Sequence, residues 1–260
     1  MADAIYRQIA DDLRLKIESG ELAPGSQLPT ELELREQYDN ASRNTVRDAI
    51  KWLTTRGLVR TQPGRGTFVV EKIKPFIMPL TPGERSFVEG DGFVEAVKRQ
   101  GGKPSASDPR VEVQNARDDG ARALGIEKGS MVVVRHQRRF IDGSPSSLQT
   151  SFYPMDFVQR GAGRLLEASD IKPGVTDYLK GKFGIEQAGY RDRLTVRPPN
   201  SGEIAFFRIP DDGTVLIVVT HRTAYDRDLK PIRYTVTTYP ADRNDFVIDF
   251  GMVPPIDELL

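Results

Sequence analysis

The first seventy residues contain three short segments with helical apolar spacing, and these limit the possible folds more than any other feature of the chain. The first segment, Ala4–Glu18, has an aliphatic residue at every fourth position, namely Ile5, Ile9, Leu13 and Ile17. This spacing predicts a helix with one buried face. We expect Asp3 to cap the start of this helix and Gly20 to mark its end.

The second and third segments are also predicted to be helices, and only a few residues separate them. The second covers residues 29–38, with Thr30 as the N-cap and Glu33 completing a capping box. The third begins at Ser42 and ends at Gly57. Its apolar stripe, spaced i, i+3, i+4, i+7, consists of Val46, Ala49, Ile50 and Leu53. We expect this stripe to pack inward and Trp52 to pack at its edge.

Two extended runs, Leu58–Thr61 and Thr67–Val70, follow the third helix. Residues Gln62–Gly66, with one proline and two glycines, join them. Extended residues on both sides of such a turn predict a β-hairpin. Three short helices followed by a hairpin make the plan of a winged helix-turn-helix, which we assign to residues 1–71.

The remainder of the chain has a different residue pattern, with a proline-rich segment followed by mostly strand-like runs. Residues 72–83 contain three prolines and no apolar period, which predicts a semi-extended linker. A second domain is expected at 84–253, with a tail at 254–260. Its predicted helices are Gly92–Gln100 and Val175–Phe183. Its predicted strands are Arg110–Asn115, Met131–Ile141, Ser147–Tyr153, Val215–Tyr225, Ile232–Tyr239 and Phe246–Phe250. Hairpins outnumber helices and no βαβ rhythm appears, which indicates an α+β fold on an antiparallel sheet.

The composition excludes several kinds of chemistry. The chain has no cysteine and two histidines, His136 and His221, so disulfides, thiolate catalysis and Cys-ligated metals are excluded. We expect no metal and no other cofactor. No apolar run reaches the ~18–20 residues of a membrane helix, and the amino-terminal segment lacks the apolar core of a signal peptide. These features predict a cytoplasmic protein without a membrane partner.

The overall charge is balanced, with 37 basic and 37 acidic side chains, but one segment is strongly basic. Within Ser42–Gly66 there are six basic residues and one acidic residue, Asp48. Such a local field predicts a surface that binds a polyanion. The alternative is an ordinary solvated helix face.

Four ordered motifs resemble the DNA-binding domain of GntR-type bacterial transcription regulators. The family pattern is G-x-l-x-P-G-x-x-L-P-[ST]-E, [ST]-R-x-T-[VL]-R, G-[LW]-[VI] and G-x-G-T-x-V. The matching segments are, in order, Gly20–Glu31, Ser42–Arg47, Gly57–Val59 and Gly64–Val69. The rest of the chain resembles the effector domain of the HutC subgroup, whose fold is similar to chorismate lyase. The segments that carry this second resemblance are Arg139, Asp142–Pro145, Phe152–Pro154, Phe183–Gly184, Arg222 with Tyr225–Asp226, and Asp242–Arg243.

The third helix and the hairpin supply the expected contacts to DNA. Ser42 is expected to cap the helix and leave free N–H groups beside a phosphate. Arg43 and Arg47, one turn apart, are expected to reach guanine, and Asn44 to reach adenine. The other expected contacts are Thr45 and Lys51 to phosphates, Arg65 in the minor groove, and Gly64 and Gly66 where the backbone approaches the duplex. The alternative for the two arginines is a surface salt bridge, for instance with Asp48.

Leu32 departs from the family pattern, because relatives often carry arginine directly after Pro-[ST]-Glu. This departure puts one DNA contact in question. We expect it to narrow or shift the preferred operator.

The resemblance to the HutC subgroup also implies which residues line the effector cleft. An amino-sugar-responsive member would carry Arg, Glu, Ser, Tyr, Glu and Tyr where this chain has Arg139, Gln149, Gly174, Thr176, Arg233 and Tyr239. An amide and a cation thus replace two carboxylates, so the expected effector is an anion, a carboxylate or a phosphate. Alternatively, Arg233 pairs with Asp226, Asp228 or Asp249 and the domain binds no ligand.

Together these features predict a ligand-responsive repressor that binds an inverted-repeat DNA operator as a homodimer. One alternative is a DNA-binding or plasmid-maintenance module whose second domain only dimerises. Another is an enzyme, given the lyase-like fold. We expect no enzyme, because the sequence lacks a Gly-x-Ser-x-Gly elbow, a phosphate loop, a dinucleotide fingerprint and a paired-histidine metal site.

Overall fold

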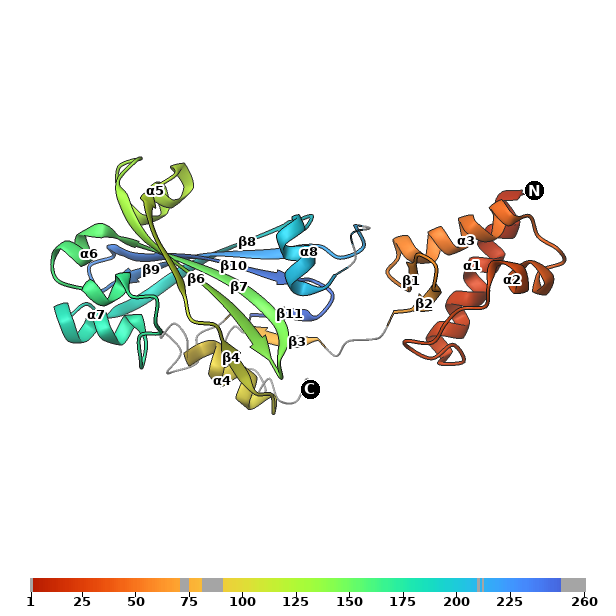
Figure 1. The fold of residues 1–260 in the computed structure, drawn as a ribbon, viewed down its shortest axis with the longest axis horizontal. Coiled ribbons are helices and arrows are strands. Elements are labelled where there is room, and N and C mark those ends of the chain that lie inside the picture. Colours follow the sequence, from red (N-terminus) through yellow and green to blue (C-terminus); the bar gives the residue numbers. More distant parts are fainter. Residues whose placement is uncertain (1, 71–74, 81–90, 210, 212, 249–260) are drawn as a thin grey trace. The chain divides into compact units, whose positions relative to one another are not determined.

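Two compact units make up the chain in the computed structural model. The first is built mainly from residues 1–74 and the second from most of the remainder. Helices dominate the first unit and a large β-sheet the second (Figure 1). The structure describes residues 2–70, 75–80, 91–209, 211 and 213–248. Every helix within these ranges is too short or too polar to cross a lipid bilayer.

The first unit is a three-helix body with a two-stranded wing. Its elements are α1 (Ala2–Ser19), α2 (Glu31–Gln37), α3 (Arg43–Thr55), β1 (Val59–Gln62) and β2 (Gly66–Val69). The two strands pair antiparallel, so the predicted winged helix-turn-helix is confirmed. The predicted cap at Asp3 is wrong, because α1 already begins at Ala2 and Asp3 lies inside its first turn.

The core of the first unit consists of the predicted apolar stripes. Ile9 and Leu13 of α1 are buried, whereas Ile5 is exposed. From α3, Val46 and Leu53 contribute fully buried side chains to the same cluster. The partly buried side chains packed around it include Ile17, Ile50 and Trp52. The four-residue spacing of apolar residues in α1 and the i, i+3, i+4, i+7 spacing in α3 therefore predict the face that each helix buries.

Both predicted helix caps in the turn region are present. The Thr30 hydroxyl accepts a hydrogen bond from the Glu33 N–H, and a Glu33 carboxylate oxygen accepts one from the Thr30 N–H at 2.7 Å. Ser42 caps α3, because its hydroxyl accepts the Thr45 N–H at 3.1 Å. These caps fix where α2 and α3 begin, and so fix the turn between them.

The wing depends on a contact with the segment ahead of α2. The Gln27 side-chain amide donates to the Arg65 carbonyl at 3.1 Å. Gly66 has a φ of +117°, and a Cβ there would collide with the same amide. Gly64, with a φ of +72°, has no atom near its Cβ position. The contact with Gln27 therefore requires glycine at position 66, whereas the space around the Cβ position of Gly64 is empty.

The second unit is built on a seven-stranded sheet. Its helical elements are α4 (Asp91–Arg99), α5 (Asp118–Leu124), α6 (Met155–Gln159), η1 (Gly163–Leu166), α7 (Val175–Phe183) and α8 (Ser201–Phe207). The strands of the sheet are β4 (Pro104–Ala106), β5 (Arg110–Asn115), β6 (Met131–Ile141), β7 (Ser144–Pro154), β8 (Gln187–Arg197), β9 (Ile217–Asp226) and β10 (Pro231–Pro240). Their order is β4-β6-β7-β10-β9-β8, with β5 also paired to β6. Every pairing in this sheet is antiparallel, as predicted.

Alternation along the strands gives the sheet one polar and one apolar face. The register places Gln137 of β6 opposite Gln149 of β7, and Gln149 opposite Thr237 of β10. We call this side the polar face and define it by Arg135, Gln137, Arg139, Gln149, Ser151, Thr235 and Thr237. The opposite side carries Val132, Val134, Phe152 and Tyr234.

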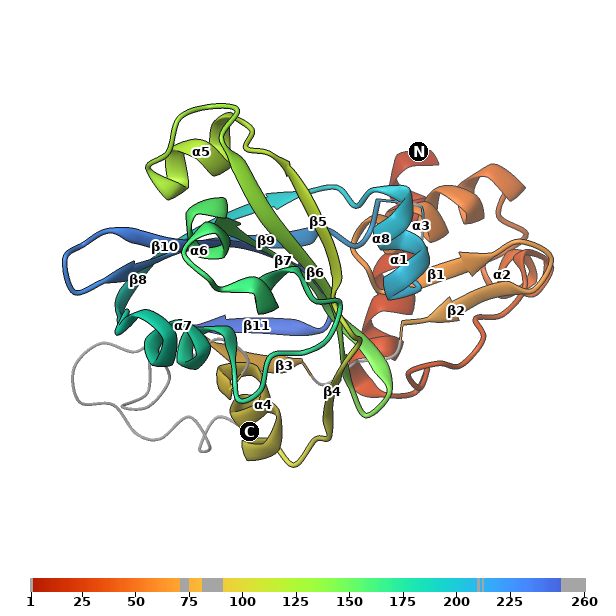
Figure 2. The same ribbon diagram turned by 60° about the vertical axis from the view of Figure 1, so that its left-hand side comes forward.

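Helices cover both faces of the sheet. On the polar face, α6 and α7 pack at one end through Phe157 and Leu179, and α4 packs at the other through Phe93 and Val97. On the opposite face, α5 packs through Leu124. In Figure 1, α5 lies above the sheet while α4 and α7 lie below it, and Figure 2 gives a second view of this arrangement. The middle of the polar face is thus flanked by α4 and α7.

A short parallel pair joins the start of the second unit to its last strand. β3 (Phe76–Pro79) pairs with β11 (Asn244–Val247). The prediction of an irregular linker is therefore wrong for residues 76–79: prolines sit at the ends of this strand, where they are tolerated, and Ile77 and Met78 are buried. The rest of the predicted linker, 72–74 and 81–83, and the end of the predicted last strand, 249–250, lie outside the described residues.

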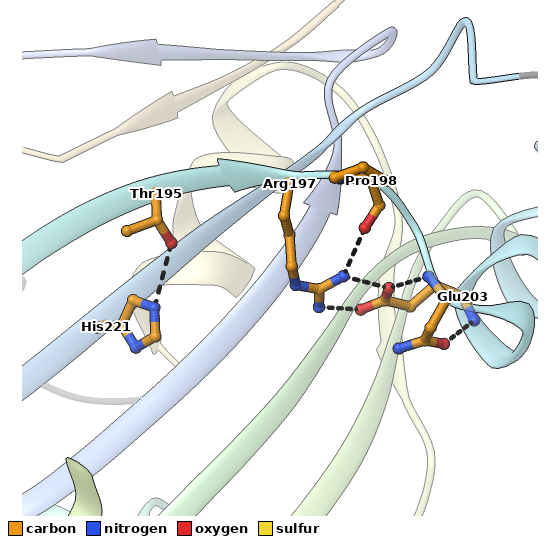
Figure 3. A network of polar contacts seen from close by, with 6 residues as sticks. Thr195, Arg197, Pro198, Glu203 and His221 are labelled. Atoms are coloured by element: carbon orange, nitrogen blue, oxygen red, sulfur yellow. Dashed lines mark hydrogen bonds and ion pairs between the residues drawn. The ribbon is translucent and has the colours of Figure 1, made fainter.

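The helix α8 is fastened to β8 by a buried carboxylate (Figure 3). Glu203 accepts two hydrogen bonds from Arg197, at 2.6 and 2.7 Å, and a third from the Asn200 N–H. Burial raises the pKa of Glu203, but the hydrogen bonds from the Arg197 side chain and the Asn200 N–H together outweigh it and hold this pKa below the usual range. This network fixes the return from the edge strand β8 toward β9.

Candidate DNA interface and effector pocket

The outward face of α3 is basic and exposed. Arg43, Asn44, Arg47 and Lys51 are all exposed, on the side opposite the buried stripe. Ser42 and Thr45 stand at the start of this helix, and their hydroxyls hydrogen-bond each other at 2.8 Å. The helix start therefore presents backbone N–H groups next to a row of cationic and amide side chains, which suits a phosphate backbone with bases beyond it.

The two predicted base-reading arginines form ion pairs, but with a residue that sequence reasoning missed. Glu31, the first residue of α2, accepts from Arg43 Nε at 2.9 Å and from Arg47 Nε at 2.8 Å. The salt-bridge alternative named Asp48, and the structure gives Glu31 instead. Hydrogen bonds from Arg47 and then Arg43 hold the pKa of Glu31 below its usual range. The signal in the sequence was the Glu of the Pro-[ST]-Glu motif.

A groove of about 530 Å³ lies beside α3 within the first unit. Arg47 and Lys51 line it from the helix, and Gly64 and Gly66 line it from the wing. The structure thus brings these four predicted contacts to one surface. Arg65 is exposed at the wing tip, where its carbonyl accepts the bond from Gln27.

A pocket of about 560 Å³ lies on the polar face between α4 and the segment that precedes α7. Arg139 and Gln149, both buried, line it from the sheet, and Phe93 lines it from α4. The Arg139 guanidinium carbon lies 5.0 Å from the centre of the Phe93 ring. Gly174, the N-cap of α7, is also part of the wall and supplies no side-chain cap.

The other three predicted effector residues do not line this pocket. Arg233 is buried beside α7, where it donates to the Thr176 hydroxyl and to the Gln187 amide oxygen, each at 3.1 Å. Asp226 and Asp228, two of the partners in the alternative hypothesis, are not among these two acceptors, and the third, Asp249, lies outside the residues that the structure describes. Tyr239 packs edge-on against Phe246, with ring centres 5.2 Å apart. Arg139 lines this pocket and Arg233 does not, so the expected meeting of these two side chains in one effector cleft stays a prediction.

The wall of the pocket is held by a second buried arginine. Arg135 donates to the carbonyls of Leu165, Glu167 and Ser169 at 2.7–2.8 Å. These carbonyls belong to the segment that leads into the lining residues 170–175. Of the charged residues in the lining, Arg139 is buried, whereas Asp108, Asp170 and Lys172 are exposed. The pocket therefore has one buried cation and a mixed, solvated rim.

Both histidines lie in the sheet of the second unit, where each contacts a hydroxyl group. His136 Nδ1 contacts the Thr150 hydroxyl at 2.9 Å, and His221 Nδ1 contacts the Tyr234 hydroxyl at 2.8 Å. Figure 3 shows the other His221 nitrogen against Thr195. Burial lowers the pKa of both histidines. Within the described ranges, no three His, Asp or Glu side chains converge as metal ligands.

A winged helix with a basic outward helix, followed by a sheet domain with a polar pocket, defines a DNA-binding regulator that carries its own effector domain. Residues 5–69 match the family described as bacterial regulatory proteins, gntR family, and residues 99–245 match the UTRA domain. The chain belongs to the GntR family, in the HutC subgroup with a UTRA domain. It is a ligand-responsive, DNA-binding transcription regulator.

Curated relatives extend over nearly the whole chain. The HTH-type transcriptional repressor NagR of Bacillus subtilis is 28% identical over 94% of this chain and 93% of its own length. The HTH-type transcriptional regulator GgaR of Escherichia coli K12 is 25% identical over 94% and 90%.

Solved structures agree in fold. A putative GntR-family transcriptional regulator superposes with a TM-score of 0.73 and 23% identity, covering 96% of this chain and 98% of that one. PhnF from Mycobacterium smegmatis superposes with a TM-score of 0.56, also at 23% identity, covering 94% and 100%.

Proposed function

We propose that this regulator is a repressor that acts in the cytoplasm as a homodimer on an inverted-repeat operator. We further propose that a small anion bound beside Arg139 changes its affinity for DNA. The observation that carries the effector proposal is the buried guanidinium of Arg139 in a pocket against α4. The name of the relative NagR, a repressor, supports the direction of control.

The surface of α3 and the wing supports the DNA part of the proposal. Arg47 and Lys51 line the same groove as Gly64, whose side is open to a close approach. A homodimer presents two such surfaces related by a twofold axis, and each reads one half-site of an operator with the same symmetry.

The pocket supports an acidic effector. A buried arginine favours a bound carboxylate or phosphate, because its planar fork can donate two parallel hydrogen bonds. Gly174 adds a second attraction: it begins α7 without a side-chain cap, and the free N–H groups of a helix start attract anions. Both features point at the same cavity, and neither requires Arg233.

Helix α4 connects the pocket to the strand that follows the DNA-binding unit in the chain. Phe93 lines the pocket and shares a buried cluster with Met78 of β3. The Gln100 amide, just after α4, donates to the Ile77 carbonyl at 2.8 Å and accepts from the Ile77 N–H at 3.0 Å. A ligand that shifts α4 would thus act directly on β3, and a coupling of about 1–3 kcal/mol suffices for control.

The sequence also allowed a DNA-binding module whose second domain only dimerises, and the UTRA match over residues 99–245 argues against that alternative. A catalytic role is not part of the proposal, since the matched families and relatives are transcription regulators. Ligand binding tests the role proposed for the pocket directly, because a domain that only dimerises needs no pocket with a buried cation.

Thermal-shift measurements with a panel of carboxylates, phosphates and sugar phosphates test the effector. We expect at least one carboxylate or phosphate to raise the melting temperature of the wild type and of Arg138→Gln, but not of Arg139→Gln. Arg138 is a matched control, since it is exposed on the opposite face of the same strand. Stabilisation by hexosamine phosphates alone would contradict the general anion proposal, and an equal response of both variants would remove Arg139 from it.

Operator binding is tested with DNA that the wild-type chain enriches from a random duplex pool. We expect an inverted repeat, a binding stoichiometry of two chains per duplex and affinity that falls steeply with salt. Light scattering of the free protein gives the oligomeric state. A monomer on a single half-site would contradict the homodimer.

A further inference from the structure

A single carboxylate bridges the two arginines that the regulator directs at bases. Oε2 of Glu31 accepts from Arg43 Nε, and Oε1 accepts from Arg47 Nε, at 2.9 and 2.8 Å. Each oxygen thus serves one arginine. Because Arg43 and Arg47 are one turn apart on α3, the bridge links both side chains to the start of α2.

The position of Glu31 follows from the local sequence. Thr30 caps α2 and Glu33 completes the capping box, so the cap does not use the Glu31 side chain. Glu31 is the first residue after the cap, and Leu34 of the same helix is fully buried in the core with Val46 of α3. The packed core therefore holds α2 and α3 in the arrangement that places Glu31 between the two arginines.

The bridge adds little to the stability of the fold. Glu31 retains 35% of its side-chain exposure, and Arg43 and Arg47 retain 65% and 54%. Ion pairs between exposed side chains in water contribute little to folding, because solvent and salt screen them. A role in folding is therefore a poor reason for this arrangement.

The geometry of the bridge leaves the base-reading edge of each arginine available. Both contacts use Nε, and within the described residues no acidic side chain pairs with the terminal nitrogens of Arg43 or Arg47. Those terminal nitrogens are a guanidinium edge that matches guanine O6 and N7. Fixing the other edge removes rotamer freedom before DNA arrives, so less is lost on binding.

We propose that Glu31 is a specificity-determining positioning residue, which holds Arg43 and Arg47 ready for base contact and discourages binding to phosphates at random. The second effect follows from its negative charge, which faces the polyanion. The inference rests on the assignment of α3 to the DNA interface and adds to it the source of sequence discrimination.

The test compares Glu31→Gln with Glu36→Gln. Glu36 lies on the same helix, is exposed, and has no ion pair among the described residues, so its variant makes the same change of charge without breaking the bridge. Dissociation constants are measured for the enriched operator and for a random duplex of equal length, over a salt series. Circular dichroism and melting temperature verify that both variants fold.

For Glu31→Gln, we expect binding to the random duplex to tighten several-fold while operator binding weakens or stays constant, so that the specificity ratio falls about tenfold. For Glu36→Gln, we expect both affinities to change by the same small factor. Equal factors on both duplexes for Glu31→Gln would overturn the proposal. If the wild type itself shows no preference for any duplex, the regulator assignment of α3 fails instead.

A second readout separates positioning from a general charge effect. When Glu31→Gln is used to enrich DNA from the random pool, we expect weaker preference at both positions read by the arginines at once. Arg47→Ala is expected to lose preference at one position per half-site. An unchanged enriched motif for Glu31→Gln would also overturn the proposal.

Discussion

The guanidinium carbon of Arg139 lies 5.0 Å from the centre of the Phe93 ring, so the buried cation of the pocket rests on helix α4. Phe93 also packs in one cluster with Met78 of the strand β3. Just after the end of the same helix, the Gln100 side chain hydrogen-bonds to both the N–H and the carbonyl of Ile77. One helix thus contacts the candidate ligand site and the strand that leads toward the DNA-binding unit.

Gln100→Leu should lower the free energy of unfolding of the second unit by about 1–3 kcal/mol, because the Ile77 N–H and carbonyl lose their side-chain partner in a partly buried setting. Urea denaturation, followed by far-ultraviolet circular dichroism, measures this free energy of unfolding. Gln159→Leu, at an exposed position on α6, serves as the control. A change as small as that of the control would mean that water replaces the amide without cost.

Arg47→Ala should weaken operator binding by about 1–3 kcal/mol and relax discrimination at one base pair, as expected for a major-groove contact. Lys51→Ala should weaken binding to all duplexes alike and reduce the salt slope by about one. Fluorescence anisotropy titrations over a salt series measure both. An equal loss on operator and random DNA for Arg47→Ala would reassign that side chain to the phosphate backbone.

Leu32→Arg should tighten binding to DNA, because the leucine is 61% exposed and stands directly after Glu31, where the family resemblance implies an arginine. One added phosphate contact increases the salt slope by about one. The same titrations measure the slope, with Leu15→Arg, at another exposed leucine of the first unit, as the control. If both variants give the same slope, the added charge acts only through the general field.

Lowering the pH should destabilise the second unit through His221. Burial, chiefly, and the nearby Arg193 lower its pKa from 6.5, with Asp119 opposing and Arg197 reinforcing the effect. The unfolded chain therefore binds this proton more readily than the folded one. The loss of stability begins as the pH falls below 6.5 and ends below the folded-state pKa, and above 6.5 the group contributes no pH dependence.

Melting temperatures between pH 7.5 and 5 measure this effect in the wild type and in His221→Gln. We expect a shallower decline in the variant. A residual slope is expected from His136, whose pKa burial also lowers. Parallel curves for the two proteins would show that His221 gains or loses no proton on unfolding in this range.

The first unit was predictable almost residue by residue, because its signals are local. Caps at Thr30 and Ser42 depend on side chains three residues from their partners, and the apolar stripe of α3 has helical spacing. Glu31 escaped prediction because its partners lie twelve and sixteen residues away. Only the packing of two helices brings these side chains together.

In the second unit, strands were predicted where polar and apolar residues alternate clearly. They were missed where charged residues interrupt that alternation. The ranges Arg110–Asn115 and Met131–Ile141 match β5 and β6. The edge strand β8 was missed, since Arg191, Asp192 and Arg193 interrupt its apolar pattern. One of these charges, Asp192, pairs with Arg222 of the neighbouring β9, a contact that only the strand register reveals.

The lining of the candidate pocket was predictable in part, because strand register decides which side chains share a face of the sheet. Arg139 and Gln149 lie on neighbouring strands of one face and reach one pocket. Arg233 lies on that face as well, but the placement of α7 gives it Thr176 and Gln187 as partners. The sequence predicts on which face of the sheet a side chain lies, whereas the helix packed on that face decides which other side chains it contacts.

The parallel ladder of β3 and β11 makes the first strand of the second unit depend on residues near the other end of the sequence. Phe76 of β3 pairs with Asn244 of β11. A protease that cleaved just ahead of Asn244 would cut β11 off from the preceding strands, and β3 would keep its partner only through the contacts of that short segment. Tags and truncations at that end therefore need the same care as changes in α3 or in the candidate pocket.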